Sequence, residues 1–167
     1  MQHPRRPMLS KMQGLTLVEL IIVMAILAIF AAVAVPNYRD GMINNRLSTA
    51  AMSLYSGLAL ARSEAIKRNA DVSMQIPTGA AWQDGWQIVF INEDNDVVTI
   101  AEQPEIPNIN ITALGGVETI TFNRSGRANL TGPLFTLCSD DLPGGVERIV
   151  RIELSGMARV ERGGECP

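Results

Sequence analysis

The stretch GLTLVELIIVMAILAIFAAVAVP, residues 14–36, decides how the rest of this chain is organised. Between Leu15 and Val35 it carries one charged side chain, that of Glu19. At ~1.5 Å per residue a helix over these positions is about 31 Å long, close to the ~30 Å hydrocarbon core of a bilayer. We therefore expect a membrane-spanning helix, which Pro36 ends or kinks because proline has no N–H to donate.

Length and charge set limits on the remainder of the chain. It has 167 residues in all and a formal net charge of -3. Three basic residues, Arg5, Arg6 and Lys11, precede the apolar stretch, so 11 basic and 17 acidic side chains remain after them. This acidic balance disfavours nonspecific binding of nucleic acid by overall charge. The length allows one anchored domain with a single core.

The residues before the apolar stretch have three interpretations. An ordinary secretory signal peptide has a shorter apolar core, and its small-residue cleavage site follows that core. Here the small residue Gly14 stands before the apolar run, so cleavage there would keep the helix and create a new α-amino group at Leu15. An uncleaved signal anchor is the alternative. In either case the basic residues place this end in the cytoplasm.

A second helical pattern follows Pro36 and predicts a helix from about residue 39 to residue 68, with Asn69 as its stop. Apolar residues recur there at steps of three and four and form one stripe. The stripe consists of Leu47, Ala50, Ala51, Leu54, Leu58, Ala61 and Ala65. Its small side chains predict that a sheet packs closely against this helix.

From Asp71 the pattern changes from helical to alternating, which predicts a β-rich domain. Strands are expected at 72–76, 86–91, 97–101, 118–122, 134–138, 148–154 and 158–160, and residues 103–116 are expected to form a loop with at most a short edge strand. The predicted fold class is α+β, with a long N-terminal, membrane-spanning α-helix packed on a C-terminal antiparallel β-sheet domain.

Candidate catalytic groups are few. His3 is the only histidine, so a chain cleaved after Gly14 has no histidine-based catalytic or metal site. Asp140 and Asp141 are adjacent acids in a loop rich in Gly and Pro, where solvation is the usual explanation. No enzyme activity, cofactor or metal is predicted.

Cys138 and Cys166 lie far downstream of the apolar stretch. An exported domain meets an oxidising compartment, where an even cysteine count fits one disulfide. Two free thiols are the alternative. A bridge would stabilise the fold by about 3–4 kcal/mol through chain entropy.

The run GLTLVEL, followed by an apolar helix ending in Pro36, resembles the leader and N-terminal helix of type IV pilins and type II secretion pseudopilins. The resemblance implies that a prepilin peptidase cuts between Gly14 and Leu15, that Leu15 is N-methylated, and that Glu19 is the glutamate retained in the mature chain. Leu15 departs from the phenylalanine most common at that position. The implied divisions are 1–14 as leader, 15–36 as transmembrane and assembly helix, 37–69 as its amphipathic continuation, and 70–167 as a β-rich periplasmic domain.

Later landmarks extend the resemblance to minor pilins and pseudopilins of the GspH/FimT type. They are ARSEAIKRN at 61–69, DGW at 84–86, ITFNRSGRA at 120–128, FTLC ending at Cys138, and RIELSGMARV at 151–160. The resemblance implies a low-copy subunit of a type IV pilus or a secretion pseudopilus, near its tip. Its partners would be other major and minor pilins or pseudopilins, the prepilin peptidase and the bacterial inner membrane, crossed once with the C-terminal domain in the periplasm.

Glu19 then has a physical role in assembly. After cleavage Leu15 carries a cationic amine and Glu19 an anion, and in or near hydrocarbon each charge needs a partner. Pairing Glu19 of one subunit with the Leu15 amine of another would neutralise both charges and set the axial register. The alternative is a Glu19 side chain that only reaches toward the lipid headgroups.

The alternative function is DNA binding for natural transformation. Some minor pilins of the resembled type bind DNA through a Gly-Arg-x-Arg-like motif near the C-terminus. In SGMARVER, Gly156, Arg159 and Arg162 remain, but Met157 replaces the first arginine. Interleaved glutamates would weaken the attraction for phosphate, so DNA is a partner that the sequence does not favour.

Overall fold

The computed structural model describes residues 16–166, so the predicted cleavage residues Gly14 and Leu15 lie outside the described part of the chain. It contains a single long helix, α1 (Leu17–Arg68), of 52 residues, which is followed by strands β1 to β8. The chain divides between Arg39 and Asp40 into two compact units. Each unit is described by itself.

The first unit contains the apolar beginning of α1. Among the described residues, α1 is the one helix long and apolar enough to cross a membrane. The prediction that Pro36 could end this helix is wrong, because the backbone stays helical through Pro36 and on to Arg68. Pro36 removes one hydrogen bond, to the carbonyl of Ala32, and the long helical segments on both sides maintain a continuous backbone.

In the second unit α1 packs through the predicted stripe, whose seven residues are buried and at most 2 % exposed. The helix ends at Arg68, and Asn69 follows with a φ of 52°. The N–H of Ala70 donates to the carbonyl of Ala65 at 3.2 Å. This left-handed residue after the last helical turn is a common way to end a helix, and it confirms Asn69 as the stop.

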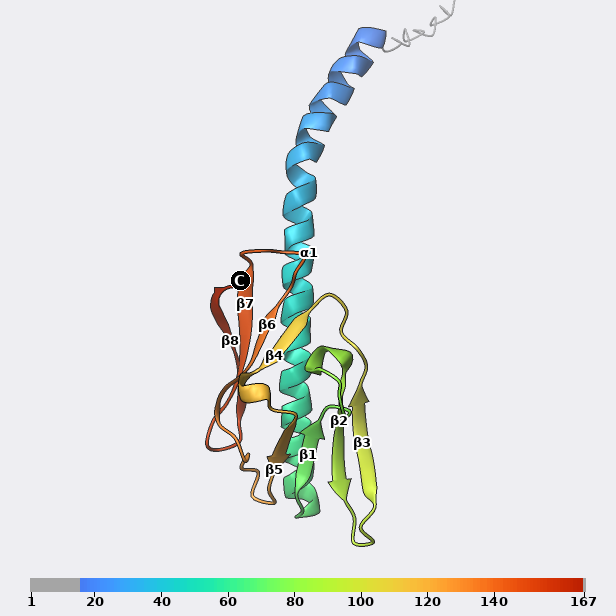
Figure 1. The fold of residues 1–167 in the computed structure, drawn as a ribbon. Helices are drawn as coiled ribbons and strands as arrows, with labels where there is room; N and C mark the ends of the chain where they lie inside the picture. The colour runs from blue at the N-terminus through green and yellow to red at the C-terminus, as the bar shows by residue number, and fades with distance from the viewer. Residues whose placement is uncertain (1–15, 167) are drawn as a thin grey trace, which may run out of the picture. The chain divides into compact units, whose positions relative to one another are not determined.

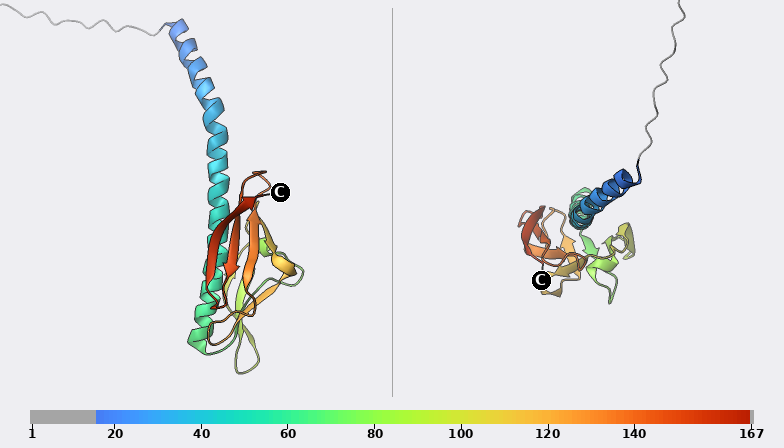
Figure 2. Two further views of the ribbon diagram at one scale, coloured as in Figure 1. Left: turned by 90° about the vertical axis from the view of Figure 1, so that its left-hand side faces the viewer. Right: turned by 90° about the horizontal axis from the view of Figure 1, so that it is seen from above.

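Two four-stranded antiparallel sheets lie along one side of this part of α1 (Figures 1 and 2). The first has the order β3-β2-β1-β5 and consists of β1 (Val72–Gln75), β2 (Trp86–Ile91), β3 (Val97–Gln103) and β5 (Thr119–Phe122). The second has the order β4-β6-β7-β8 and consists of β4 (Asn110–Ala113), β6 (Gly132–Cys138), β7 (Val146–Ile152) and β8 (Ala158–Glu165). The α+β fold is confirmed, and its division into two sheets is an addition to the prediction.

The last strands differ most from their predicted limits. β7 begins at Val146 instead of residue 148, and β8 continues to Glu165 instead of ending at residue 160. The extension of β8 follows from its pairing with β7, which brings Val146 opposite Glu165. The edge strand expected within residues 103–116 is β4.

Trp82 joins the two sheets in the core. It lies in the short helix η1 (Trp82–Asp84) before β2, and its indole N–H donates to the carbonyl of Val117 at 2.6 Å. Its ring meets the ring of Phe135, from β6, edge to face with 4.7 Å between centroids. Such aromatic contacts add to the stabilisation that comes from burial alone.

Candidate functional site

Glu19 lies in the first turn of α1 and forms a capping box with Thr16. The backbone N–H and the Oγ1 hydroxyl of Thr16 both donate to Glu19 Oε2 at 2.9 Å. The N–H of Glu19 in turn donates to Thr16 Oγ1 at 3.3 Å. These bonds satisfy N–H groups that the start of a helix leaves without partners. The pattern T-x-x-E at 16–19 signals such a box, and an interpretation of Glu19 from its charge alone misses it.

The capping box leaves half of the Glu19 carboxylate available. Oε2 takes both hydrogen bonds from Thr16, and within residues 16–166 no donor bonds to Oε1. Glu19 is exposed in the single chain. The carboxylate is therefore held at the start of the helix with one oxygen free to accept from a cation outside the chain.

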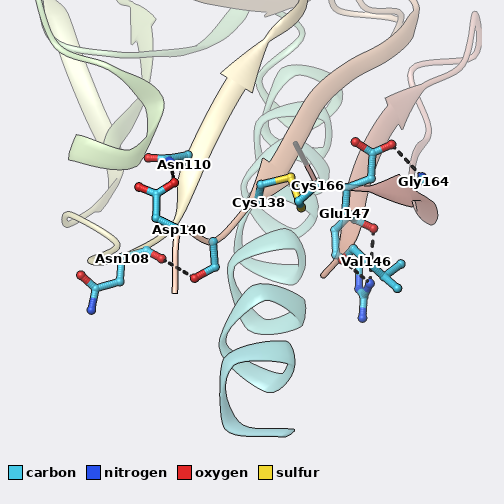
Figure 3. Close-up of a disulfide and its surroundings, with 10 residues drawn as sticks. Asn108, Asn110, Cys138, Asp140, Val146, Glu147, Gly164 and Cys166 are labelled. Atoms are coloured by element: carbon cyan, nitrogen blue, oxygen red, sulfur yellow. Dashed lines mark hydrogen bonds between the residues drawn. A yellow bond between two sulfur atoms is a disulfide. The ribbon is translucent and has the colours of Figure 1, made fainter. Parts of the chain in front are cut away.

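Cys138, the last residue of β6, and Cys166, which directly follows β8, form a disulfide with 5.8 Å between their Cα atoms (Figure 3). The N–H of Cys166 also donates to the carbonyl of Gly145 at 2.7 Å. The bridge ties the end of the edge strand β8 to the end of β6, and the hydrogen bond ties it to the loop before β7.

In the described part of the chain, structural contacts account for Asp140 and for the two cysteines. Within residues 16–166 no cluster of His, Cys, Asp and Glu side chains could hold a metal ion. The carboxylate of Asp140 accepts a hydrogen bond from Asn110 Nδ2 at 2.7 Å, so it fastens the loop after β6 to β4 (Figure 3). Both cysteines are consumed by the disulfide.

Arg159 and Arg162, the residues considered for DNA binding, lie on opposite faces of the second sheet. The register of β7 and β8 pairs Arg151 with Arg159 and Arg148 with Arg162. Side chains alternate between faces along a strand, so Arg148 and Arg162 share the face of the buried Val150, while Arg151 and Arg159 share the other face. Strand pairing therefore does not gather the two candidate residues into one patch.

The two arginines on the outer face are paired with acids. Arg159 Nη2 donates to the carboxylate of Glu153, and Arg151 Nε donates to Glu161 Oε2 at 3.4 Å. Both pairs are partly solvent-exposed, so each contributes little to stability. The two ion pairs nevertheless neutralise the positive charges of Arg151 and Arg159, which the binding of a phosphate would need.

An apolar N-terminal helix that continues into an antiparallel β domain defines a pilin-like protein. The prokaryotic N-terminal methylation motif matches residues 9–35, and the family of the type II transport protein GspH matches residues 50–156. The chain belongs to the GspH family.

The chain is similar to three further proteins. Pilin-like protein PilA1 of Thermus thermophilus is 37% identical over 82 residues, which are 49% of either chain, so this chain spans about half the length of that relative. The type IV minor pilin FimU of Pseudomonas aeruginosa has a TM-score of 0.62 and 21% identity over 74% of this chain and 97% of FimU. The minor pseudopilin EpsH of the type 2 secretion system of Vibrio cholerae has a TM-score of 0.57 and 16% identity over 72% of this chain and 99% of EpsH. At these identities the two structures share the fold.

Proposed function

We propose that this chain is a minor subunit of a type IV pilus or a type II secretion pseudopilus, placed near the tip of the filament. A prepilin peptidase cuts it between Gly14 and Leu15, and Leu15 is then N-methylated. Before assembly it crosses the inner membrane once, with residues 70–167 in the periplasm. The observation that carries this proposal is the succession of a methylation motif at 9–35 and a GspH domain at 50–156 in one chain.

Assembly in this proposal depends on the free oxygen of Glu19. Cleavage creates an amine at Leu15, and methylation keeps its positive charge. In an apolar surrounding an uncompensated charge is costly, so the amine of one subunit and Glu19 Oε1 of another stabilise each other only when their helices are in register. Thr16 holds the other oxygen through its hydrogen bonds and so fixes the position of the carboxylate.

The test compares Glu19→Ala with Thr16→Ala in the full-length chain, expressed with its partner subunits. We expect Glu19→Ala to be cleaved normally but to fall at least about tenfold in the sheared filament fraction, because one charge of a desolvated pair is removed. Thr16→Ala removes the two hydrogen bonds of the hydroxyl but keeps the carboxylate and the backbone N–H that positions it, so its incorporation stays close to that of the parent chain. The measurement is immunoblotting of membrane and filament fractions.

Two results contradict this mechanism. Normal incorporation of Glu19→Ala shows that the charge pair is not needed for assembly. Equal losses in Glu19→Ala and Thr16→Ala show that Glu19 acts only as a helix cap.

DNA binding is the alternative function, which the sequence does not favour, and the pairing of Arg159 with Glu153 does not favour it either. A gel shift with the detergent-solubilised full chain at low salt tests it, since contacts with phosphate strengthen as salt falls. A shift that Arg159→Ala with Arg162→Ala removes would support DNA uptake. The absence of any shift would end this alternative.

A further inference from the structure

Arg148 of β7 and Arg162 of β8 are neighbours in the second sheet, and neither forms an ion pair within the described part of the chain. The strand register places them directly opposite one another. Arg148 is only 8 % exposed, and its Nη1 donates to the carbonyls of Val146 and Glu147 at 3.0 and 3.3 Å. Ion pairs within 4.0 Å do occur elsewhere on these strands, but within residues 16–166 none includes Arg148 or Arg162.

The two neighbouring arginines destabilise the fold of the single chain. Like charges directly opposite in an antiparallel pair are destabilising, and a buried charge without a counter-ion is more so. Burial first, and then the positive charge of Arg162, lower the pKa of Arg148 below its ordinary value. A nearby anion would offset both effects.

The acids along these strands are committed elsewhere or lie apart. Glu147 Oε1 accepts a hydrogen bond from the N–H of Gly164 at 2.9 Å (Figure 3). This bond holds the carboxylate at the irregularity in the pairing of β7 with β8. Glu161 pairs with Arg151. Glu165 is exposed and lies in register with Val146, and it forms no ion pair within 4.0 Å in the described part of the chain. Within the described part of these two strands no acid therefore neutralises Arg148 or Arg162.

Local charge favours a single carboxylate over a polyanion. Residues 146–165 contain four arginines and four glutamates, so the two strands and their turn have no net charge to attract a nucleic acid. Guanidinium groups suit the planar geometry of a carboxylate. Arg162 is exposed on β8, at the edge of its sheet, where a group from another molecule can reach it.

We propose that Arg148 and Arg162 form an acceptor site for a carboxylate side chain of a neighbouring subunit in the filament. This inference rests on the proposed function and adds to it a contact of the β domain that is independent of Glu19. The carboxylate of the neighbour offsets the repulsion between the two arginines, so the site is complete only in the assembly.

Arg162→Gln in the full-length chain tests the site, because it removes one charge and leaves the backbone hydrogen bonds of Arg148 in place. We expect about tenfold less chain in the filament fraction, as for the loss of one partner of a desolvated pair. The thermal midpoint of the purified chain in detergent is expected to stay equal or to rise, since the repulsion is gone. Arg159→Gln, on the same strand but on the outer face, is the matched control and keeps normal incorporation.

Several results would overturn the site. They are normal incorporation of Arg162→Gln, a lower thermal midpoint that explains its loss, or the same loss in Glu165→Gln, which would make Glu165 the true partner. Normal incorporation together with the loss of a DNA gel shift would assign the arginines to a polyanion instead.

If Glu19→Ala is excluded from filaments while Arg162→Gln enters them, only this inference fails. If the parent chain never enters filaments, the proposed function fails and this inference fails with it.

Discussion

Among single residues, Glu64 holds the side chain of Arg68, which connects the end of α1 to the first sheet. It is nearly buried, and it accepts hydrogen bonds from Arg68 Nε at 2.7 Å and from Lys67 Nζ at 3.2 Å. The guanidinium of Arg68 also lies over the ring of Phe90 in β2, 4.1 Å from its centroid. The hydrogen bond from Arg68, and next that from Lys67, hold the pKa of Glu64 below its ordinary value of 4.5.

The direction of this pKa shift predicts a dependence of stability on pH. A carboxyl group with a lowered pKa in the folded chain stabilises the fold above its unfolded pKa, and this contribution disappears as the pH falls through the folded pKa. We therefore expect Glu64→Gln to melt at a lower temperature than the parent chain at pH 7, and the gap to close as the pH falls well below 4.5. Thermal unfolding at both pH values checks this. A gap that is the same at both would contradict it.

At the scale of elements, two turns that close hairpins in the β domain are built alike and pack together. The N–H of Gly126 donates to the carbonyl of Asn123, and the N–H of Gly156 donates to that of Glu153, both at 2.8 Å. Arg62 of α1 donates its Nε to the carbonyl of Gly126 at 3.0 Å. Gly156 has a φ of 78°, and a Cβ there would overlap the carbonyl oxygen of Gly126. The contact between the turns thus requires glycine.

Gly156→Ala is expected to destabilise the fold by about 2–4 kcal/mol, because the positive φ and the overlap act together. Gly144→Ala is the control. Gly144 has a similar φ of 72°, but a Cβ there meets nothing within 4 Å. Gly144→Ala should therefore lower the free energy of unfolding by only about 1 kcal/mol. Urea unfolding of the full chain in detergent measures both, and equal effects would show that the two turns are not in contact.

Elements with a strong internal period were predictable, whereas those that depend on distant partners were not. The stripe from Leu47 to Ala65 indicates its buried face through spacing alone, and the structure buries all of it. The segment ERGGE at the end of β8 has no alternation, and it is a strand because β7 pairs with it and the disulfide holds its end. Arg159 and Arg162 stand three apart in sequence, and they face opposite ways because β8 extends beyond its predicted end at residue 160 and includes both.

At the scale of the whole molecule, the two units differ in how they expose apolar surface. The first unit leaves large apolar side chains exposed along α1, from Leu17 to Phe30, with exposed fractions of 46% to 73%. Exposed apolar surface on this scale marks a membrane or an interface between proteins. The second unit buries its own core of helix and sheet residues. In the proposed function the first unit therefore serves the membrane and then the filament, while the second presents its surface to neighbouring subunits.

The proposed function requires above all that the chain loses residues 1–14 and enters a filament with Leu15 at its start. Mass spectrometry of its N-terminal peptide, taken from the sheared filament fraction, tests this most directly. We expect a peptide that begins at N-methylated Leu15. A chain that keeps residues 1–14 and remains in the membrane fraction, absent from filaments, would contradict the proposed function.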